Sequence, residues 1–427
     1  MLDIKFIREN SEAVRAGALK KRIQIDIDGL LALDANARRI QREAEDLRAE
    51  QNKKSKEVGK VAPADRPAFL EGLKDLKERL KTIETEEKQL DEKLRIELLK
   101  VPNMAAPEVP VGPDESGNVE LRTWGENVKF NFSANFRAKD HSELMQMHSM
   151  VDIERGARIS GSRNYFLKND GVLLEIAVMR YALDHMMKKG FTVLGVPLMV
   201  RRDAMEGTAY FPGGEEQAYT CNKDELYLIG TSEVPLTSYH SGEILEEADL
   251  PKKYVAWSTC FRREAGTYGK DTSGIYRVHQ FQKIEQVILC KADEAESKSW
   301  HREILNNSEE LLQAFKIPYR VLHICTGDLG AAQVEKFDLE AWMPARNGYG
   351  ETHSASRFYD FQSRRLDIRY RPAGGGSPRF VHTLNNTVVA SPRILIAIIE
   401  NYQQEDGSIR IPDALIPYFG KEVIARR

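Results

Sequence analysis

The sequence has little cysteine and no long apolar run. Its 427 residues include only four cysteines, which are far apart and form no CxxC pair. This pattern argues against a disulfide framework and against a cysteine-rich zinc site. The N-terminal segment lacks the apolar stretch of a secretory signal, and the longest apolar run, ILIAII at 394–399, is far shorter than the ~20 residues of a membrane span. We therefore expect a cytoplasmic protein.

The chain also lacks a strong excess of either charge. It has 62 basic and 65 acidic residues, for a net charge of −3, so any affinity for nucleic acid must come from a local basic patch. Hydrophobic residues make up 41% of the chain, which is enough for a sizeable core, and its length favours two or three domains.

Residues 27–100 show a heptad pattern. Apolar residues recur in steps of three and four from Leu30 to Leu47, and again from Phe69 to Leu94. The segment between these runs, GKVAPADRP at 59–67, contains glycine and proline residues that end helices. The pattern predicts two helices that fold back on each other as an antiparallel coiled-coil arm.

The predicted tip of this arm is basic. Across 51–67, Glu57 and Asp65 are the only acidic residues, whereas five residues are basic: Lys53, Lys54, Lys56, Lys60 and Arg66. One interpretation is a solvated helix end. The other is a binding site for a polyanion, which a rigid projecting arm with a basic end favours.

A linker containing proline and glycine, residues 101–118, precedes a region of mixed helix and strand patterns. We expect helices near 171–189 and 392–403, a proline-containing strand within 190–200, and strands at about 254–265, 275–290, 318–325 and 380–386. Strands outnumber crossover helices in the middle of this region, which favours an α+β fold with an antiparallel sheet.

Segment 261–285, FRREAGTYGKDTSGIYRVHQFQKIE, has an unusual polar pattern. Two paired strands joined by a glycine-rich turn would place Arg262 and Glu264 on one face of the first strand. The matching face of the second strand would hold Arg277, His279, Phe281, Lys283 and Glu285. Arginine binds phosphate oxygens through a planar fork, an aromatic ring stacks on a base, and a carboxylate holds an ammonium group. The alternative is a surface ladder of ion pairs.

Three shorter motifs add possible binding groups. Ser391 and Pro392 suit the N-cap and the first position of a helix, and Arg393 follows them, so this helix start could bind phosphate. Glu351 and Ser354 offer oxygen ligands of the kind that Mg²⁺ prefers. By itself, GTSEVPL at 230–236 is a generic helix-capping turn, and the residues around 351–354 could equally form a solvated loop.

Together these motifs resemble the seryl-tRNA synthetases of the common bacterial and organellar kind, a family of class II aminoacyl-tRNA synthetases. FRRE at 261–264 and HQFQKIE at 279–285 are similar to the family's motif 2, LNNTVVASPR at 384–393 to its motif 3, and GFTVLGVP at 190–197 to its motif 1. GTSEVPL matches the family's serine-binding turn. The spacings from Thr231 to Arg262 and from Arg262 to Glu285 also agree with the family pattern.

The resemblance implies a role for each matching residue. The serine pocket would comprise Thr231, Ser232, Glu233, Arg262, Glu285, Asn385 and Thr387. ATP would contact Arg262, Arg263, Glu264, Phe281, Glu351, Thr352, His353, Ser354 and Arg393. The two catalytic residues would be Arg262 and Arg393, Mg²⁺ would bind Glu351 and Ser354, and tRNA would contact the five basic residues of the tip.

The resemblance also implies an N-terminal tRNA-binding domain at 1–105, a catalytic domain at 106–427, and a homodimer built through motif 1. Expected partners are L-serine, ATP and tRNA(Ser), with tRNA(Sec) left open; no DNA or membrane partner is expected. The chain departs from the usual family pattern at several positions, which puts fine specificity in question: Arg263, His353, Asn386, Thr387 and Pro392.

Two other functions remain as alternatives. One is a ligase that loads an amino acid onto a carrier protein, although such proteins tend to lack a long arm. The other is an inactive coiled-coil interaction protein, although the complete set of charged motif residues disfavours a decayed active site.

Overall fold

A computed structural model describes residues 1–126, 136–266 and 274–426. Contacts divide the chain into two compact units: residues 2–19 and 23–102 form one, and residues 1, 20–22 and 103–427 form the other. The first unit contains α1 (Ile4–Glu9), α2 (Ser11–Lys20), α3 (Ile27–Glu57) and α4 (Arg66–Lys100). No helix within the described ranges is long and apolar enough to cross a bilayer.

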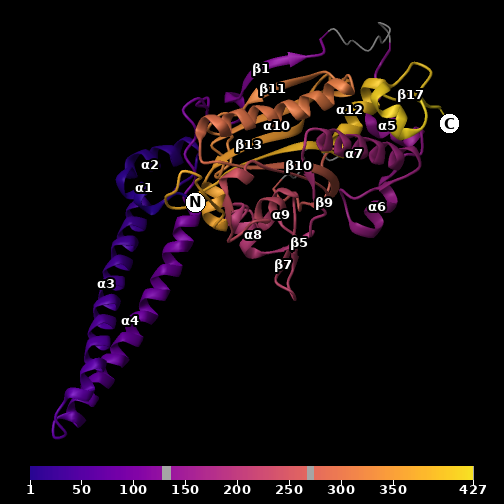
Figure 1. Ribbon diagram of the computed structural model, residues 1–427. Coiled ribbons are helices and arrows are strands. Elements are labelled where there is room, and N and C mark those ends of the chain that lie inside the picture. The colour runs from indigo at the N-terminus through magenta and orange to yellow at the C-terminus, as the bar shows by residue number, and fades with distance from the viewer. Residues whose placement is uncertain (127–135, 267–273, 427) are drawn as a thin grey trace. The chain divides into compact units, whose positions relative to one another are not determined.

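Helices α3 and α4 form the predicted antiparallel arm (Figure 1). The heptad residues Ile40 and Leu90 pack together nearer its base, and Leu47 packs with Leu76 and Leu80 nearer the tip. The remaining helix faces are mostly polar and exposed, as expected of a two-helix assembly with one apolar seam, although Leu70 and Ile96 of α4 are exposed as well. The prediction of two helices with a break at 59–67 is confirmed, apart from a short 3₁₀ turn at Val58–Lys60 and an early start of α4 at Arg66.

The second unit is built on an eight-stranded sheet with strand order β1-β11-β12-β13-β16-β10-β9-β4. Every pairing in this sheet is antiparallel except that of β4 with β9, which confirms the α+β prediction. Its strands are β1 (Val119–Trp124), β4 (Thr192–Val193), β9 (Lys252–Phe261), β10 (Gln280–Cys290), β11 (Tyr319–His323), β12 (Glu335–Met343), β13 (Gly348–Tyr359) and β16 (His382–Ala390).

Helices cover both faces of this sheet. The helices of this unit are α5 (His141–Met147), α6 (Ile153–Ser160), α7 (Asp170–Lys188), α8 (Arg202–Gly207), α9 (Glu233–Ser238), α10 (Glu294–Ala314), α11 (Phe361–Leu366), α12 (Arg393–Tyr402) and α13 (Ile416–Phe419). In Figure 1, α10 lies along one face, and α8 and α9 lie on the other side. The main core lies between α7, α10, α12 and the first face, and includes Leu174, Ile288, Ile304 and Ile396.

Smaller sheets complete the unit. They comprise β2 (Val151–Asp152) with β3 (Phe166–Leu167), β5 (Met199–Arg201) with β6 (Thr220–Cys221) and β7 (Leu226–Leu228), β8 (Ile244–Glu246) with β14 (Arg369–Arg371) and β15 (Arg379–Phe380), and β17 (Ile409–Arg410) with β18 (Val423–Ile424).

Three local expectations need correction. The strand expected at 254–265 ends at Phe261, and its partner begins at Gln280, so Arg262, Glu264, Arg277 and His279 lie outside the paired strands. Residues 267–273 of the connection lie outside the described residues. The single strand expected within 190–200 is two short strands in different sheets, because proline and glycine interrupt it.

The third correction concerns the start of α12. The helix begins at Arg393 with Pro392 as its N-cap, so Ser391 is not the cap that the sequence indicated. The Ser391 hydroxyl instead donates a hydrogen bond to the Glu175 carboxylate of α7. The half-buried carboxylate of Glu175 therefore binds the hydroxyl that the sequence indicated as a helix cap.

Candidate active site

One cavity lies in the large sheet where β13 and β16 separate. It encloses about 900 Å³ of empty space, including its open mouth. Strand pairing between β13 and β16 runs from Tyr359–Thr383 to Ala355–Asn386, and residues of both strands beyond that last pair line the cavity. Twelve of the residues predicted from the sequence line it: Glu233, Arg262, Glu264, Phe281, Glu285, Glu351, Thr352, His353, Ser354, Asn385, Thr387 and Arg393.

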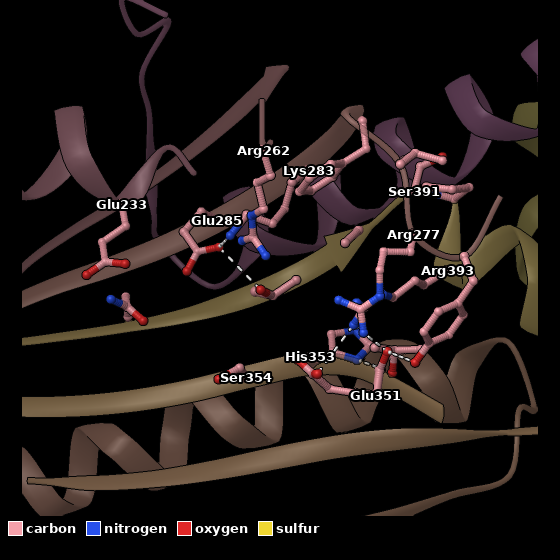
Figure 2. A pocket seen from close by; sticks show the side chains of 18 of the residues that line it. Glu233, Arg262, Arg277, Lys283, Glu285, Glu351, His353, Ser354, Ser391 and Arg393 are labelled. Atoms are coloured by element: carbon pink, nitrogen blue, oxygen red, sulfur yellow. Dashed lines mark hydrogen bonds and ion pairs between the residues drawn. The ribbon is translucent and has the colours of Figure 1, made fainter. Parts of the chain in front are cut away.

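Carboxylates occupy one end of the cavity. Figure 2 shows Glu233 and Glu285 at this end, with Lys283 and Arg262 next to them. Glu285 is 2% exposed, and its Oε2 lies 2.5 Å from Nζ of Lys283 and accepts a 3.4 Å hydrogen bond from the hydroxyl of Thr387. Thr387 is the direct cross-strand partner of Glu285. This end can hold a small ligand with an ammonium group and a hydroxyl.

The carboxylate of Glu233 is held on both oxygens. Tyr210 donates to Oε2 at 2.8 Å and the side-chain amide of Gln362 donates to Oε1 at 2.9 Å, while Thr383 in turn donates to Gln362. Burial and the nearby negative charge of Glu285 raise the pKa of Glu233 to about 7. Its charge therefore changes within the physiological pH range.

Arginines occupy the other end of the cavity, as Figure 2 shows for Arg277 and Arg393 beside Glu351. Arg393 NH1 donates to the carbonyl of Glu351 at 2.9 Å and lies 3.4 Å from its carboxylate. The guanidinium also stacks over the ring of Tyr276, 4.6 Å from its centroid. Burial by itself would raise the pKa of Glu351, but the positive charges of Arg393, Lys336 and Arg262 have the larger effect and lower it. Fixed cations of this kind bind phosphate oxygens.

An aromatic ring lies next to Arg262 in the same cavity. The guanidinium of Arg262 lies 5.2 Å from the centroid of the Phe281 ring, and its Nε donates to the carbonyl of Gly230. Glu264 forms a 3.0 Å ion pair with Arg277 across the cavity wall. The site therefore combines a stacking surface with cations that the backbone and carboxylates hold in place.

A β-bulge brings Glu351 and Ser354 to the same cavity. Regular strand residues three apart face opposite sides, but Leu339 pairs with His353 and the next residue, Glu340, pairs with Glu351, so Thr352 is the extra residue. The carboxylate of Glu351 and the hydroxyl of Ser354 therefore line the cavity together. This pair of hard oxygen donors fits Mg²⁺.

Some predicted site residues lie elsewhere. The Thr231 hydroxyl accepts a hydrogen bond from the backbone N–H of Glu233, and the Ser232 hydroxyl donates to Ala256, so both hold the turn before α9 and neither lines the cavity. Arg263 is exposed and donates to the carbonyl of Glu216. His279 is also outside the cavity, with its ring against the carbonyl of Arg262.

His353 is a buried strand residue, which corrects the interpretation of 351–354 as a solvated loop. It is 1% exposed in β13, and its Nε2 donates to the carbonyl of Val388 at 3.1 Å. Burial lowers the pKa of His353 to about 4, so the ring is neutral at physiological pH.

Sequence reasoning missed several residues that shape the cavity. The set of residues assigned to the site contained neither Arg277 nor Lys283, although both belong to segment 261–285, and both line the cavity. It also omitted Tyr210, Tyr276 and Gln362. These residues act through contacts between distant segments, and no local pattern singles them out. The sequence signal for Arg277 was present, since it belongs to the polar pattern of 261–285.

The fold and the site define the class. Residues 218–402 match the model of the tRNA synthetase class II core domain (G, H, P, S and T), and residues 1–105 match that of the seryl-tRNA synthetase N-terminal domain. The chain is therefore a class II aminoacyl-tRNA synthetase. It belongs to the seryl-tRNA synthetase family, because it is 45% identical to the serine–tRNA ligase of Deinococcus radiodurans over 100% of this chain and 99% of the relative.

Solved structures agree with this assignment. The crystal structure of seryl-tRNA synthetase from Pyrococcus horikoshii complexed with ATP matches with a TM-score of 0.89 and 42% identity, covering 100% of both chains. The cytoplasmic serine–tRNA ligase of Naegleria fowleri in complex with AMP matches with a TM-score of 0.87 and 33% identity, over 100% of this chain and 99% of that chain.

Proposed function

We propose that this chain is a serine–tRNA ligase that activates L-serine with ATP and transfers the seryl group to the 3′ end of tRNA(Ser). One observation supports this most directly: a single cavity has a carboxylate end suited to serine and an arginine end suited to a nucleoside triphosphate. The Pyrococcus horikoshii relative, similar over its whole length, is complexed with ATP.

In the first step, the serine carboxylate attacks the α-phosphorus of ATP, forming seryl-adenylate and releasing pyrophosphate. Glu285 holds the serine ammonium group, and Glu233 and Thr387 face its hydroxyl. Arg262 stabilises the negative charge that develops on the α-phosphate, and Phe281 stacks on the adenine ring. Arg393 binds the terminal phosphate. Catalysis then depends on orientation and fixed positive charge, with no protein nucleophile.

In the second step, the 3′-terminal adenosine of tRNA attacks the carbonyl carbon of seryl-adenylate, and AMP leaves. The ester bond forms as the mixed anhydride breaks. The same site positions both steps, because the serine group and the adenosine of the intermediate remain on the residues that bound serine and ATP.

The oxygen donors of Glu351 and Ser354 would hold Mg²⁺, which neutralises charge on the phosphate oxygens when bound. Among the described residues, no group of three or more His, Cys, Asp or Glu side chains could hold a metal ion. The remaining ligands would thus be phosphate oxygens and water, which is the coordination that Mg²⁺ prefers.

The arm belongs to the same proposal as the tRNA-binding element. At its tip, Lys53, Lys56, Lys60 and Arg66 are exposed, whereas Lys54 is half-buried and pairs with Glu50 at 2.7 Å. These cations are available to phosphates of the nucleic acid, whose contribution to affinity is electrostatic and salt-dependent.

The chain would act as a homodimer. Large apolar side chains are exposed on α7, where Leu173 is 48% and Ile176 is 47% exposed, and Val193 of the adjoining β4 is 39% exposed. Such side chains on neighbouring elements favour burial against a second copy.

A cytoplasmic location is part of the same proposal, since the Naegleria fowleri relative is named as a cytoplasmic enzyme.

The comparisons do not support the two alternatives. Loading of a carrier protein and an inactive coiled-coil function both leave unexplained why residues 1–105 match the N-terminal domain of seryl-tRNA synthetases and why the relatives are similar from end to end.

The direct test measures transfer of labelled serine to bulk tRNA by the purified protein with ATP and Mg²⁺, with threonine and alanine as controls. We expect charging with serine alone. Adenylate formation without charged tRNA would contradict the proposed acceptor, and absence of both would contradict the activity.

A further inference from the structure

A buried polar cluster lies behind the serine end of the cavity, between the sheet and α10. On β16, alternate residues face opposite sides: Thr387 lines the cavity, and Asn386 faces α10. Its cross-strand partner Gln286 also faces α10. Asn386, Gln286 and Ser308 of α10 are each 0% exposed. Burial of polar groups costs free energy unless hydrogen bonds replace those to water. Here the amide nitrogens of Asn386 and Gln286 are bonded, whereas Oδ1 of Asn386 has no partner among the described residues.

The hydroxyl of Ser308 joins the helix to the strand. It donates to the backbone carbonyl of Thr387 at 2.7 Å and accepts from the side-chain amide of Asn386 at 2.8 Å. The Asn386 amide also donates to the carbonyl of Ile304 at 2.6 Å, as does that of Gln286 at 3.0 Å. Each bond ties one strand residue to α10.

These bonds occur where strand pairing stops. The pairing of β16 with β13 ends at Asn386, and the next two carbonyls, those of Thr387 and Val388, accept from the side chains of Ser308 and His353. The backbone that presents Thr387 to the cavity is therefore held on this side by side chains instead of a neighbouring strand. The opposite edge of this segment pairs with β10, so removal of one of these side chains takes away a bond from one edge only.

We propose that Ser308 and Asn386 are positioning residues that set the selectivity for serine by fixing Thr387 opposite Glu285. This inference rests on the proposed function. The Thr387 hydroxyl points to Glu285 at 3.4 Å, so its place depends on the backbone that Ser308 holds. One hydroxyl thus accepts from the side-chain N–H of Asn386 and donates to the carbonyl of Thr387, which links two consecutive residues of β16 to α10.

The test compares Ser308→Ala with Ser297→Ala in the full-length protein. Ser297 is a matched control, since it is a buried serine of α10 whose hydroxyl bonds only to Glu294 of the same helix among the described contacts. The readout is ATP–pyrophosphate exchange, with KM measured separately for serine, threonine and ATP.

We expect Ser308→Ala to raise the KM for serine about tenfold, while the KM for ATP changes less than about twofold, because the buried carbonyl of Thr387 loses its donor and the amide of Asn386 loses one of its two acceptors. A rigid pocket wall is needed to exclude the methyl group of threonine. Because Ser308→Ala loosens this wall, the ratio of kcat/KM for serine over threonine should fall about fivefold. Ser308→Thr, which keeps the hydroxyl, should restore most of the serine KM.

Equal increases in the KM values for serine and ATP, an unchanged serine KM, or the same effect from Ser297→Ala would overturn the inference. If Ser308→Ala does not fold, Asn386→Gly takes its place, with an expected serine KM increase of about threefold and the same criteria. An unmodified protein without serine-dependent exchange would contradict the proposed function. Normal exchange that is insensitive to these variants would contradict only the role of Ser308 and Asn386.

Discussion

The arm and the catalytic unit differ in how far apart in sequence their contacting residues lie. In the arm, the buried apolar residues pack against the other helix of one hairpin, so a single periodicity specifies both partners. In the catalytic unit, the cavity combines Glu233, Glu285, Glu351 and Arg393, which come from four separate elements. The structure of the arm therefore depends on a repeated pattern, and the structure of the cavity depends on the assembly of distant segments.

This difference suggests a division of labour. The arm presents exposed cations on a stiff support, where removal of one charge has a small effect. The cavity holds charges that are mutually bonded, where the removal of one group changes its neighbours. The predictions below separate the two regions by their effects on serine activation and on tRNA charging.

The largest effect is expected from Arg262→Ala. It removes the cation proposed to stabilise the α-phosphate, so serine-dependent pyrophosphate exchange should fall by about 10³-fold. Arg263→Ala is the matched control, because the exposed Arg263 lies outside the cavity; exchange should stay within about threefold. If Arg262→Ala and Arg263→Ala lost the same amount of exchange activity, a position inside the cavity would not explain the role of Arg262.

Deletion of residues 29–98 should separate the two regions. We expect tRNA charging to fall by at least about 10²-fold because the proposed phosphate contacts of the arm are lost, while pyrophosphate exchange stays within about threefold. Both rates are measured on the same preparation. Normal charging by the shortened protein would contradict the role of the arm.

The pH dependence of serine binding tests the carboxylate end of the cavity. Because the pKa of Glu233 is raised to about 7, its carboxyl group is ionised above this pH and becomes protonated as the pH falls below it. One unit below the pKa about a tenth of the molecules are ionised, so the KM for serine should rise about tenfold between about pH 8 and pH 6. In Glu233→Gln this dependence should vanish, at a higher KM throughout; persistence of the profile would assign it to another group.

The smallest effect is expected at the tip of the arm. The triple change of Lys53, Lys56 and Lys60 to Gln should raise the KM for tRNA about fivefold and reduce its salt dependence, without changing pyrophosphate exchange. A matched triple change of the exposed α4 residues Lys81, Lys88 and Lys93 removes the same charge away from the tip. If both variants weaken tRNA binding equally, the net charge of the arm determines the affinity for tRNA, and the position of the lysines at the tip does not.

Prediction from sequence was most complete where contacts are local. The heptads predicted the arm, and the alternate residues Phe281, Lys283 and Glu285 of β10 line one cavity, as their shared strand face indicated. Errors arose at the ends of elements: Ser391 was expected to cap α12, but it bonds to Glu175 of a distant helix. A capping preference is a local property, and a tertiary contact overrode it.

The sequence by itself determined the arm, the antiparallel sheet and the class of reaction, because periodicity and motif spacing act within one segment or one hairpin. Only the tertiary structure decided which side chains meet. The bulge at Thr352 brings Glu351 and Ser354 together, and α10 places Ser308 behind Thr387. Strand register and helix packing depend on the whole core, so no local pattern of residues encodes these contacts.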